Sequence, residues 1–282
     1  MKLSVALRLG RVSNLPTVTS NVLAGVALAG GAPSALRIAG ISLAMSMMYV
    51  AGMFLNDAFD REIDARERPE RPIPAGEVRA ATVFDVGFGL LLGGVVLVAL
   101  VALAAGAGWR PVLCAGALAT LIVFYDAYHK QNPLSPVVMG LCRVGVYATA
   151  AFATARHVDP ALLRGTIAVL GYLIGLTYIA RQENLSRFTN LWPLGVLVIP
   201  FWIALPEDLF SAAIYIGFLA STRTALALLI RRKIRESVTL LIAGISLLDA
   251  CLAANQGCLG LAVGAVAAFG LTRWYQRSVP GT

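Results

Sequence analysis

Long apolar runs recur along the chain and are separated by short polar stretches. A helix that crosses the hydrocarbon core of a bilayer needs roughly 20 mostly apolar residues. Runs near this length occupy residues 15–31, 37–56, 82–105, 111–127, 135–155, 162–180, 190–205, 209–230, 238–254 and 258–274. This pattern predicts an all-α, multi-pass membrane bundle that forms a single domain over residues 1–282. Ten segments can be counted, and one of the last four is either a full span or a re-entrant or interfacial helix.

The composition is far from that of a soluble domain. Hydrophobic residues make up 58 % and charged residues 13 % of the chain, whereas an average soluble domain carries about 25 % charged residues. The formal net charge of +8 is compatible with nucleic-acid binding, but the basic residues are not interleaved with aromatic residues on one face. The four cysteines form no C-x-x-C pair, which indicates neither a disulfide framework nor a zinc site. We therefore expect a lipid bilayer, and no nucleic acid, as a partner.

The distribution of Lys and Arg between the loops predicts the orientation. If all ten segments cross, seventeen of the 23 Lys and Arg residues fall on the side of the N-terminus, and four fall on the other side. Loops rich in Lys and Arg stay in the cytoplasm. We therefore expect a cytoplasmic N-terminus in a prokaryotic inner (plasma) membrane. With nine spans, only the last two arginines change sides.

Residues 56–76 hold the densest charge in the chain. Seven of the 15 acidic residues fall in or just after this stretch, and ionised groups next to hydrocarbon are costly. Asn56, Asp60 and Asp64 are four residues apart, so they share one face of a helix. Mg²⁺ prefers oxygen ligands, commonly one or two carboxylates completed by water and phosphate. The pattern therefore predicts a metal-bound polyphosphate, with Arg61, Arg66, Arg68 and Arg71 placed to bind phosphate oxygens.

Spacing alone leaves a second interpretation of this stretch. Asp57–Arg61 and Asp64–Arg68 are i,i+4 pairs, and such pairs can line a solvated helix end without binding any ligand. Asn56 favours the ligand site, because an Asn-Asp pair facing the bundle has no role in a surface ladder of ion pairs.

Three motifs resemble those of the UbiA superfamily of intramembrane prenyltransferases, which includes 4-hydroxybenzoate polyprenyltransferases. Asn56-Asp57-x-x-Asp60-x-x-x-Asp64, followed by Glu67-Arg68-Pro69-x-Arg71-Pro72-Ile73-Pro74-x-Gly76, closely resembles its first aspartate-rich motif. Residues 11–16 are similar to its N-terminal motif, and residues 125–130 to its Tyr/Lys motif. The resemblance implies a bundle of usually nine spans around a central cavity that is capped on the cytoplasmic side. There a prenyl diphosphate would bind through Mg²⁺, and its prenyl group would pass to a lipophilic acceptor.

The residue chemistry and the resemblance together predict a role for individual residues. Asp60, Asp64 and Lys130 would be catalytic. Metal binding would fall to Asn56, Asp57, Asp60, Asp64 and Glu183. Diphosphate binding would fall to Arg11, Arg61, Arg68, Arg71, Lys130 and Arg181. Asn14, Tyr125 and Arg143 would line the cavity or contact the acceptor.

Two of these assignments have structural alternatives. Lys130 either offsets phosphate charge or is a snorkelling residue at a span end, paired with Asp126 at i,i+4. Asn14 either forms a hydrogen bond at the mouth of the pocket or caps the first span.

The second aspartate-rich motif of the family is depleted. It is expected near residues 181–190, where this chain has Arg181-Gln182-Glu183-Asn184 and one carboxylate in place of two or more. Either Glu183 holds a second Mg²⁺ with its neighbours, or Arg181 replaces that metal with a fixed positive charge.

Charged residues inside spans are functional candidates because they are costly in a bilayer. We expect Arg143 and Arg223 to be buried cations and Asp249 to be a buried acid. Arg143 either faces the cavity, where it would bind phosphate or an acidic acceptor, or pairs with Asp249. Five tyrosines are candidates for the cavity wall, where their rings would face an allylic cation: Tyr125, Tyr128, Tyr147, Tyr172 and Tyr178.

The sequence thus predicts Mg²⁺-dependent transfer of a prenyl group to an aromatic or lipid acceptor within the membrane. One alternative is a related protein that cyclises or only binds a prenyl diphosphate. A second is a cation-coupled transporter, although no internal repeat of the kind that transporters carry is visible.

Overall fold

The computed structural model describes residues 1–31, 33–130, 132–155, 159–181 and 195–278, and these residues form helices and turns without any strand. The helices are α1 (Leu3–Leu9), η1 (Val12–Asn14), α2 (Leu15–Leu28), α3 (Ala35–Phe59), α4 (Arg61–Glu67), α5 (Ala80–Ala105), α6 (Arg110–Tyr128), α7 (Ser135–Thr154), α8 (Pro160–Arg181), α10 (Ile199–Ile203), α11 (Leu209–Ile230), α12 (Ile234–Asn255) and α13 (Leu259–Tyr275). The predicted all-α class is therefore confirmed.

Seven of the described helices are long and apolar enough to cross a membrane: α3, α5, α6, α7, α8, α11 and α12. The apolar helices α2 and α13 are shorter, at 14 and 17 residues. The prediction of nine or ten spans is therefore not confirmed, although the positions of the seven long helices agree with the apolar runs of the sequence.

The predicted span over residues 190–205 is the main departure. In its described part, residues 195 and 196 are helical, a turn covers residues 197 and 198, and the five-residue helix α10 follows with Pro200 at its start. A proline lacks the N–H that a helix interior requires, so α10 does not continue as an unbroken span from the residues before it.

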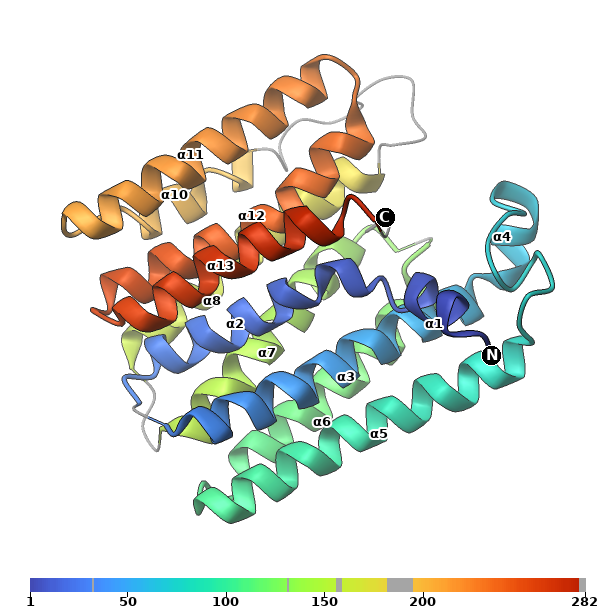
Figure 1. Ribbon diagram of the computed structural model, residues 1–282, viewed down its shortest axis with the longest axis horizontal. Coiled ribbons are helices and arrows are strands. Elements are labelled where there is room, and N and C mark those ends of the chain that lie inside the picture. The colour runs from blue at the N-terminus through green and yellow to red at the C-terminus, as the bar shows by residue number, and fades with distance from the viewer. Residues whose placement is uncertain (32, 131, 156–158, 182–194, 279–282) are drawn as a thin grey trace.

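Helices α2 and α12 form the centre of the bundle. Helix α2 packs against α3, α7, α12 and α13, and 89 % of the apolar window of α12 is buried. By contrast, only 28 % of the apolar window of α5 and 22 % of the apolar window of α11 is buried. Figure 1 shows α5 and α11 on opposite outer sides of the bundle. Their exposed leucines and isoleucines therefore face the space that lipid would fill.

Small residues allow the central helices to approach closely. A Cβ atom added to Gly25 of α2 would lie 2.7 Å from the backbone oxygen of Tyr147 in α7. Membrane helices associate through such close backbone packing, because burial of apolar surface supplies little driving force in lipid. The α2–α7 contact matters for function, because both helices carry residues of the site.

The charged stretch forms a short hairpin at one end of the bundle. Helix α3 ends at Phe59, the chain turns at Asp60, and α4 runs to Glu67 before a series of turns leads to α5. Figure 1 shows α4 projecting from the end at which α1 also lies. The turn does not disperse the motif: Asn56, Asp60 and Asp64 are only 8 %, 5 % and 1 % exposed.

Candidate active site

Arg71 joins two of the buried aspartates. Its Nη1 donates to Oδ2 of Asp64 at 2.6 Å and lies 3.2 Å from Oδ1 of Asp57. The same Asp57 oxygen accepts a hydrogen bond of 3.2 Å from Nη2 of Arg11. Arg61 pairs with Glu62 on the surface instead. The i,i+4 pairs Asp57–Arg61 and Asp64–Arg68 that the spacing allowed are therefore not formed, because both aspartates bind Arg71 and Asp57 also binds Arg11.

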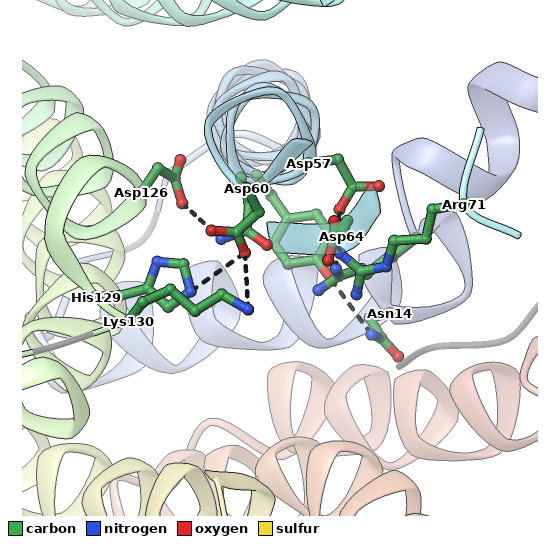
Figure 2. Close-up of polar contacts among 11 residues, drawn as sticks. Asn14, Asp57, Asp60, Asp64, Arg71, Asp126, His129 and Lys130 are labelled. Atoms are coloured by element: carbon green, nitrogen blue, oxygen red, sulfur yellow. Dashed lines mark hydrogen bonds and ion pairs between the residues drawn. The ribbon is translucent and has the colours of Figure 1, made fainter. Parts of the chain in front are cut away.

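Asp60 contacts two basic side chains at the end of α6. Its Oδ2 lies 3.4 Å from Nε2 of His129 and 3.4 Å from Nζ of Lys130 (Figure 2). The His129 ring stacks on Tyr125, with ring centroids 4.9 Å apart. Burial opposes ionisation of Asp60, but His129 and Lys130 outweigh it, and the pKa of Asp60 is lowered. Asp60 is thus kept ionised by the two side chains that face it.

Asp64 has the opposite electrostatic balance. Burial raises the pKa of its carboxyl, and the attraction of Arg71 only partly offsets this effect. The second oxygen, Oδ1, is buried and has no hydrogen-bond partner among the described residues. A carboxylate in this state would be stabilised by a further cation.

Asp126 is a site residue that sequence reasoning missed. It accepts a hydrogen bond of 3.3 Å from Nδ2 of Asn56, and its Oδ2 is buried without a partner in the described chain (Figure 2). The i,i+4 spacing makes Asp126 a possible partner of Lys130, but Lys130 contacts Asp60 instead. The available signal was a carboxylate inside a predicted span, which is itself a functional indicator. His129 was missed because the sequence showed no partner for it.

The donor set suits Mg²⁺ in its chemistry. No group of three or more His, Cys, Asp or Glu side chains in the described residues forms a ready-made metal cluster. Mg²⁺ does not require one, because it commonly binds one or two carboxylates and takes water and phosphate oxygens for the rest. Two buried carboxylate oxygens without partners, on Asp64 and Asp126, supply the hard oxygen ligands that such an ion uses.

The polar residues surround a cavity of about 290 Å³. Nine of the predicted site residues line it: Arg11, Asn14, Asn56, Asp60, Arg68, Arg71, Tyr125, Lys130 and Arg143. Asp57 and Asp64 are not among the lining residues, but both pair with Arg71, which is. Arg61 is also absent from the lining and binds the Ala58 carbonyl and Glu62.

A smaller apolar pocket of about 80 Å³ adjoins the polar cavity. The two share five wall residues: Tyr49, Met53, Tyr125, Met139 and Arg143. The rest of the smaller pocket is almost entirely apolar and includes Met45, Met48 and Leu118. The site therefore joins a charged mouth to an apolar interior.

Asn14 lies at the mouth rather than acting as a helix cap. It lines the polar cavity, its Nδ2 donates to Oη of Tyr49 at 3.3 Å, and its side chain makes no capping hydrogen bond. Of the two roles considered for Asn14, the structure therefore has the hydrogen bond at the pocket.

The tyrosine assignments need correction. Tyr125 lines both cavities, and so does Tyr49, which sequence reasoning did not select. Tyr147 and Tyr172 are fully buried, where they donate to Asp249 and to the Leu241 carbonyl. Tyr128 is 65 % exposed. Neither it nor Tyr178 is among the lining residues. The orientation of each ring depends on helix rotation within the bundle, which the spacing of tyrosines does not determine.

The two arginines inside spans differ in their surroundings. Arg143 lines the cavity, whereas Arg223 is exposed on the outer face of α11, so the prediction of a buried Arg223 is wrong. The predicted direct pair of Arg143 with Asp249 is also not formed, because Asn21 lies between them and bonds to both. Asp249 is fully buried, as expected.

The second motif falls largely outside the described residues. Glu183 lies in the segment 182–194, and Arg181 is the last residue of α8. The proposed roles of these two side chains therefore stay predictions.

A helical membrane bundle with a charged mouth above an apolar pocket defines the class of protein. The sequence profile of the UbiA prenyltransferase family matches residues 18–280. The chain therefore belongs to the UbiA prenyltransferase family, as the motifs indicated, and it is an integral multi-pass membrane protein.

Several digeranylgeranylglyceryl phosphate synthases are similar to parts of the chain. The protein of Ignicoccus hospitalis is 41 % identical over 90 residues, which are 32 % of this chain and 29 % of that protein. The protein of Thermococcus kodakarensis is 24 % identical over 208 residues, which are 73 % of this chain and 69 % of that protein. The match with the Ignicoccus protein thus spans less than a third of its length.

Solved structures share the fold. The apo structure of a UbiA homologue from Aeropyrum pernix K1 aligns with a TM-score of 0.66 and 16 % identity, covering 83 % of this chain and 96 % of that one. A digeranylgeranylglyceryl phosphate synthase structure aligns with a TM-score of 0.62 and 18 % identity, covering 94 % and 99 %.

Proposed function

We propose that the chain transfers a prenyl group from a prenyl diphosphate to a lipophilic acceptor in the membrane, with the aid of Mg²⁺. The observation that carries this proposal is the continuity between the charged cavity and the apolar pocket. A prenyl diphosphate has the same two parts, an anionic head and an apolar chain. The head would lie at the mouth and the chain in the pocket.

The diphosphate would be held by the cations of the mouth. Lys130 and Arg68 line the cavity with Arg11 and Arg71, and guanidinium groups bind phosphate oxygens in pairs. Asp60 and Asp64, with Asn56 and Asp126 beside them, are the residues that would hold Mg²⁺. When bound, Mg²⁺ would neutralise charge on the diphosphate as it leaves.

Bond exchange would take place where the two cavities meet. The bond between the first prenyl carbon and the diphosphate oxygen breaks, and the diphosphate leaves with the bonding electrons. The acceptor nucleophile forms the new bond to that carbon and loses its proton. Tyr49 and Tyr125 line both cavities, so their ring faces are placed to stabilise positive charge on the allylic carbon. The apolar walls would keep water away from that carbon.

The basic end of the molecule supports a cytoplasmic location for the mouth. The loops that precede α2 and follow α3 carry most of the residues at the mouth and are rich in arginine. Loops of this composition remain on the cytoplasmic side. We propose a prokaryotic inner membrane as the location, with the diphosphate entering from the cytoplasm.

A turnover assay tests the proposal. The purified chain in lipid nanodiscs is incubated with Mg²⁺, geranylgeranyl or farnesyl diphosphate and a lipid extract, and pyrophosphate release and prenylated products are measured. The named relatives make a geranylgeranyl donor and glyceryl phosphate lipids the first pair to assay. We expect release with the wild type and loss of release with Asp60→Asn.

The matched control is Glu62→Gln, whose side chain is 77 % exposed on the same hairpin. It should retain wild-type turnover. Absence of release with every donor, or an Asp60→Asn variant as active as the wild type, would contradict the proposal. Pyrophosphate release with a cyclised product and no acceptor adduct would indicate a cyclase instead.

A further inference from the structure

Arg143 occupies a position apart from the other cations of the cavity. It lies eight residues beyond the start of α7 at Ser135, which at 1.5 Å per residue is about 12 Å along the helix. It lines both the polar cavity and the apolar pocket, whereas Arg11, Arg68, Arg71 and Lys130 line only the polar cavity. Arg143 is therefore the cation at the inner end of the site.

The guanidinium of Arg143 is held by neutral groups. Its Nη1 donates to Oδ1 of Asn21 at 2.7 Å, and its Nη2 donates to Oγ1 of Thr17 at 3.3 Å. Its Cζ lies 5.6 Å from the ring centroid of Tyr49. Asn21 and Thr17 are fully buried on α2. These contacts fix the orientation of the guanidinium group, but they use only two of its five N–H groups.

No acid touches this guanidinium in the described part of the chain. Arg143 takes part in none of the ion pairs found there within 4.0 Å. Asp249 lies behind Asn21, and its carboxylate accepts from Asn21, Ser20 and Tyr147. Asp249 thus lines neither cavity, whereas Arg143 lines both, and the acid in the wall of the apolar pocket is Asp126, which bonds to Asn56.

A cation in this position is costly unless an anion reaches it. Ionised groups inside a membrane protein pair with one another or serve a ligand, and Arg143 is half-buried in the cavity wall without a direct acidic partner among the described residues. The four cations Arg11, Arg68, Arg71 and Lys130 and the histidine His129 already line the diphosphate subsite, so the donor does not require Arg143. The remaining substrate is the acceptor.

We infer that Arg143 binds an anionic group of the acceptor, a carboxylate or a phosphate, and so selects anionic acceptors over neutral ones. The inference rests on the proposed function and names the chemical class of the second substrate. The anion would accept hydrogen bonds from the free N–H groups of the fork. The nucleophilic atom of the acceptor would then lie between Arg143 and the donor carbon.

A binding experiment with matched probes tests this inference. The full chain in nanodiscs is saturated with geranylgeranyl thiodiphosphate, a slowly reacting donor analogue that occupies the mouth. Dissociation constants are then measured for 4-hydroxybenzoate against 4-hydroxybenzamide, and for geranylgeranylglyceryl phosphate against geranylgeranylglycerol. Each pair differs only in its anionic group, and the two pairs separate a carboxylate from a phosphate.

In at least one pair, we expect the anion to bind about 10- to 100-fold more tightly than its neutral twin, as hydrogen bonds to charged groups allow. Arg143→Met should abolish this preference and leave the affinity for the donor analogue within twofold of the wild type. Arg143→Lys, which keeps the charge but not the planar fork, should retain part of the preference. Arg223→Met, a second arginine of a membrane helix but one on the outer face, should retain all of it.

The comparison within the wild type needs no variant, so it stands even if Arg143→Met does not fold. Equal binding of both members of both pairs overturns the inference. A preference that persists in Arg143→Met also overturns it, and so does a loss of donor affinity in that variant, since Arg143 would then serve the diphosphate. Failure of the wild type to bind the donor analogue contradicts the proposed function instead.

Discussion

Nζ of Lys130 lies 3.4 Å from Oδ2 of Asp60. This contact joins the end of α6 to the turn between α3 and α4, two segments that are distant in sequence. The contact brings the ammonium group of Lys130 next to the carboxylate of Asp60, which the motif puts at the centre of the site. The mouth of the cavity thus contains pairs of opposite charge, in which Asp60 contacts Lys130, and both Asp57 and Asp64 contact Arg71.

Replacing Lys130 by methionine should impair donor binding. The variant loses a cation from the cavity wall and leaves His129 as the remaining basic partner of Asp60. A hydrogen bond to a charged group contributes about 1.5–3 kcal/mol, so the dissociation constant for geranylgeranyl diphosphate should rise about 10- to 100-fold. The control is Lys233→Met, because Lys233 pairs with Glu236 on an exposed surface. Equal effects of the two substitutions would remove Lys130 from the site.

Metal removal should stop turnover, and Asp64 should set the metal requirement. Treatment with a chelator is expected to abolish pyrophosphate release, and added Mg²⁺ is expected to restore it. In Asp64→Asn, the Mg²⁺ concentration for half-maximal activity should rise about tenfold or more, as even the outer partners of metal ligands commonly contribute that much. Asp85→Asn, an exposed acid on α5, serves as the control. An unchanged Mg²⁺ requirement in Asp64→Asn would show that the metal binds elsewhere.

The loop after α4 should loosen in acid. Arg8 donates to Glu77, and this hydrogen bond lowers the pKa of Glu77 below its ordinary value. A group whose pKa is lowered on folding stabilises the folded state above its unfolded pKa, here about 4.3, and loses that contribution as the pH falls through the folded pKa.

Hydrogen exchange of residues 68–79 measures this effect. At pH 7, Glu77→Gln should exchange faster than the wild type. Near the ordinary pKa of glutamate and below it, the difference should shrink as Glu77 of the wild type becomes protonated. A difference that is independent of pH would show that the contact does not depend on the charge of Glu77.

Packing of α2 against α7 should tolerate no added side chain at Gly25. A Cβ atom there would lie 2.7 Å from a backbone oxygen of Tyr147, so Gly25→Ala forces the two helices apart. Overpacking of this kind costs about 1–3 kcal/mol, which thermal unfolding in nanodiscs would detect. Gly116→Ala on α6 is the control, because its Cβ would meet nothing within 4 Å. That control should be neutral or stabilising, since alanine favours a helix over glycine by up to about 1 kcal/mol.

A large part of the fold can be predicted from the sequence. Lengths and hydropathies of apolar runs are local properties, and they located the seven long helices because a bilayer fixes the length that a helix needs. The same periodicity placed Asn56, Asp60 and Asp64 together on a buried side, since residues four apart share a helical face. The motifs of residues 11–16, 56–76 and 125–130 were sufficient to indicate the family.

The partners of these residues were decided by the tertiary structure alone. Arg11 and Asp57 are 46 residues apart, Asn56 and Asp126 are 70 apart, and Asn21 and Arg143 are 122 apart. Sequence spacing suggests only neighbours three or four residues away, which is why it offers Lys130 as a partner for Asp126 and Arg61 as a partner for Asp57. Helix rotation likewise put Arg223 on the outer face and Arg143 at the cavity. The sequence determines which side chains each helix carries, whereas packing of the helices determines which of those side chains meet.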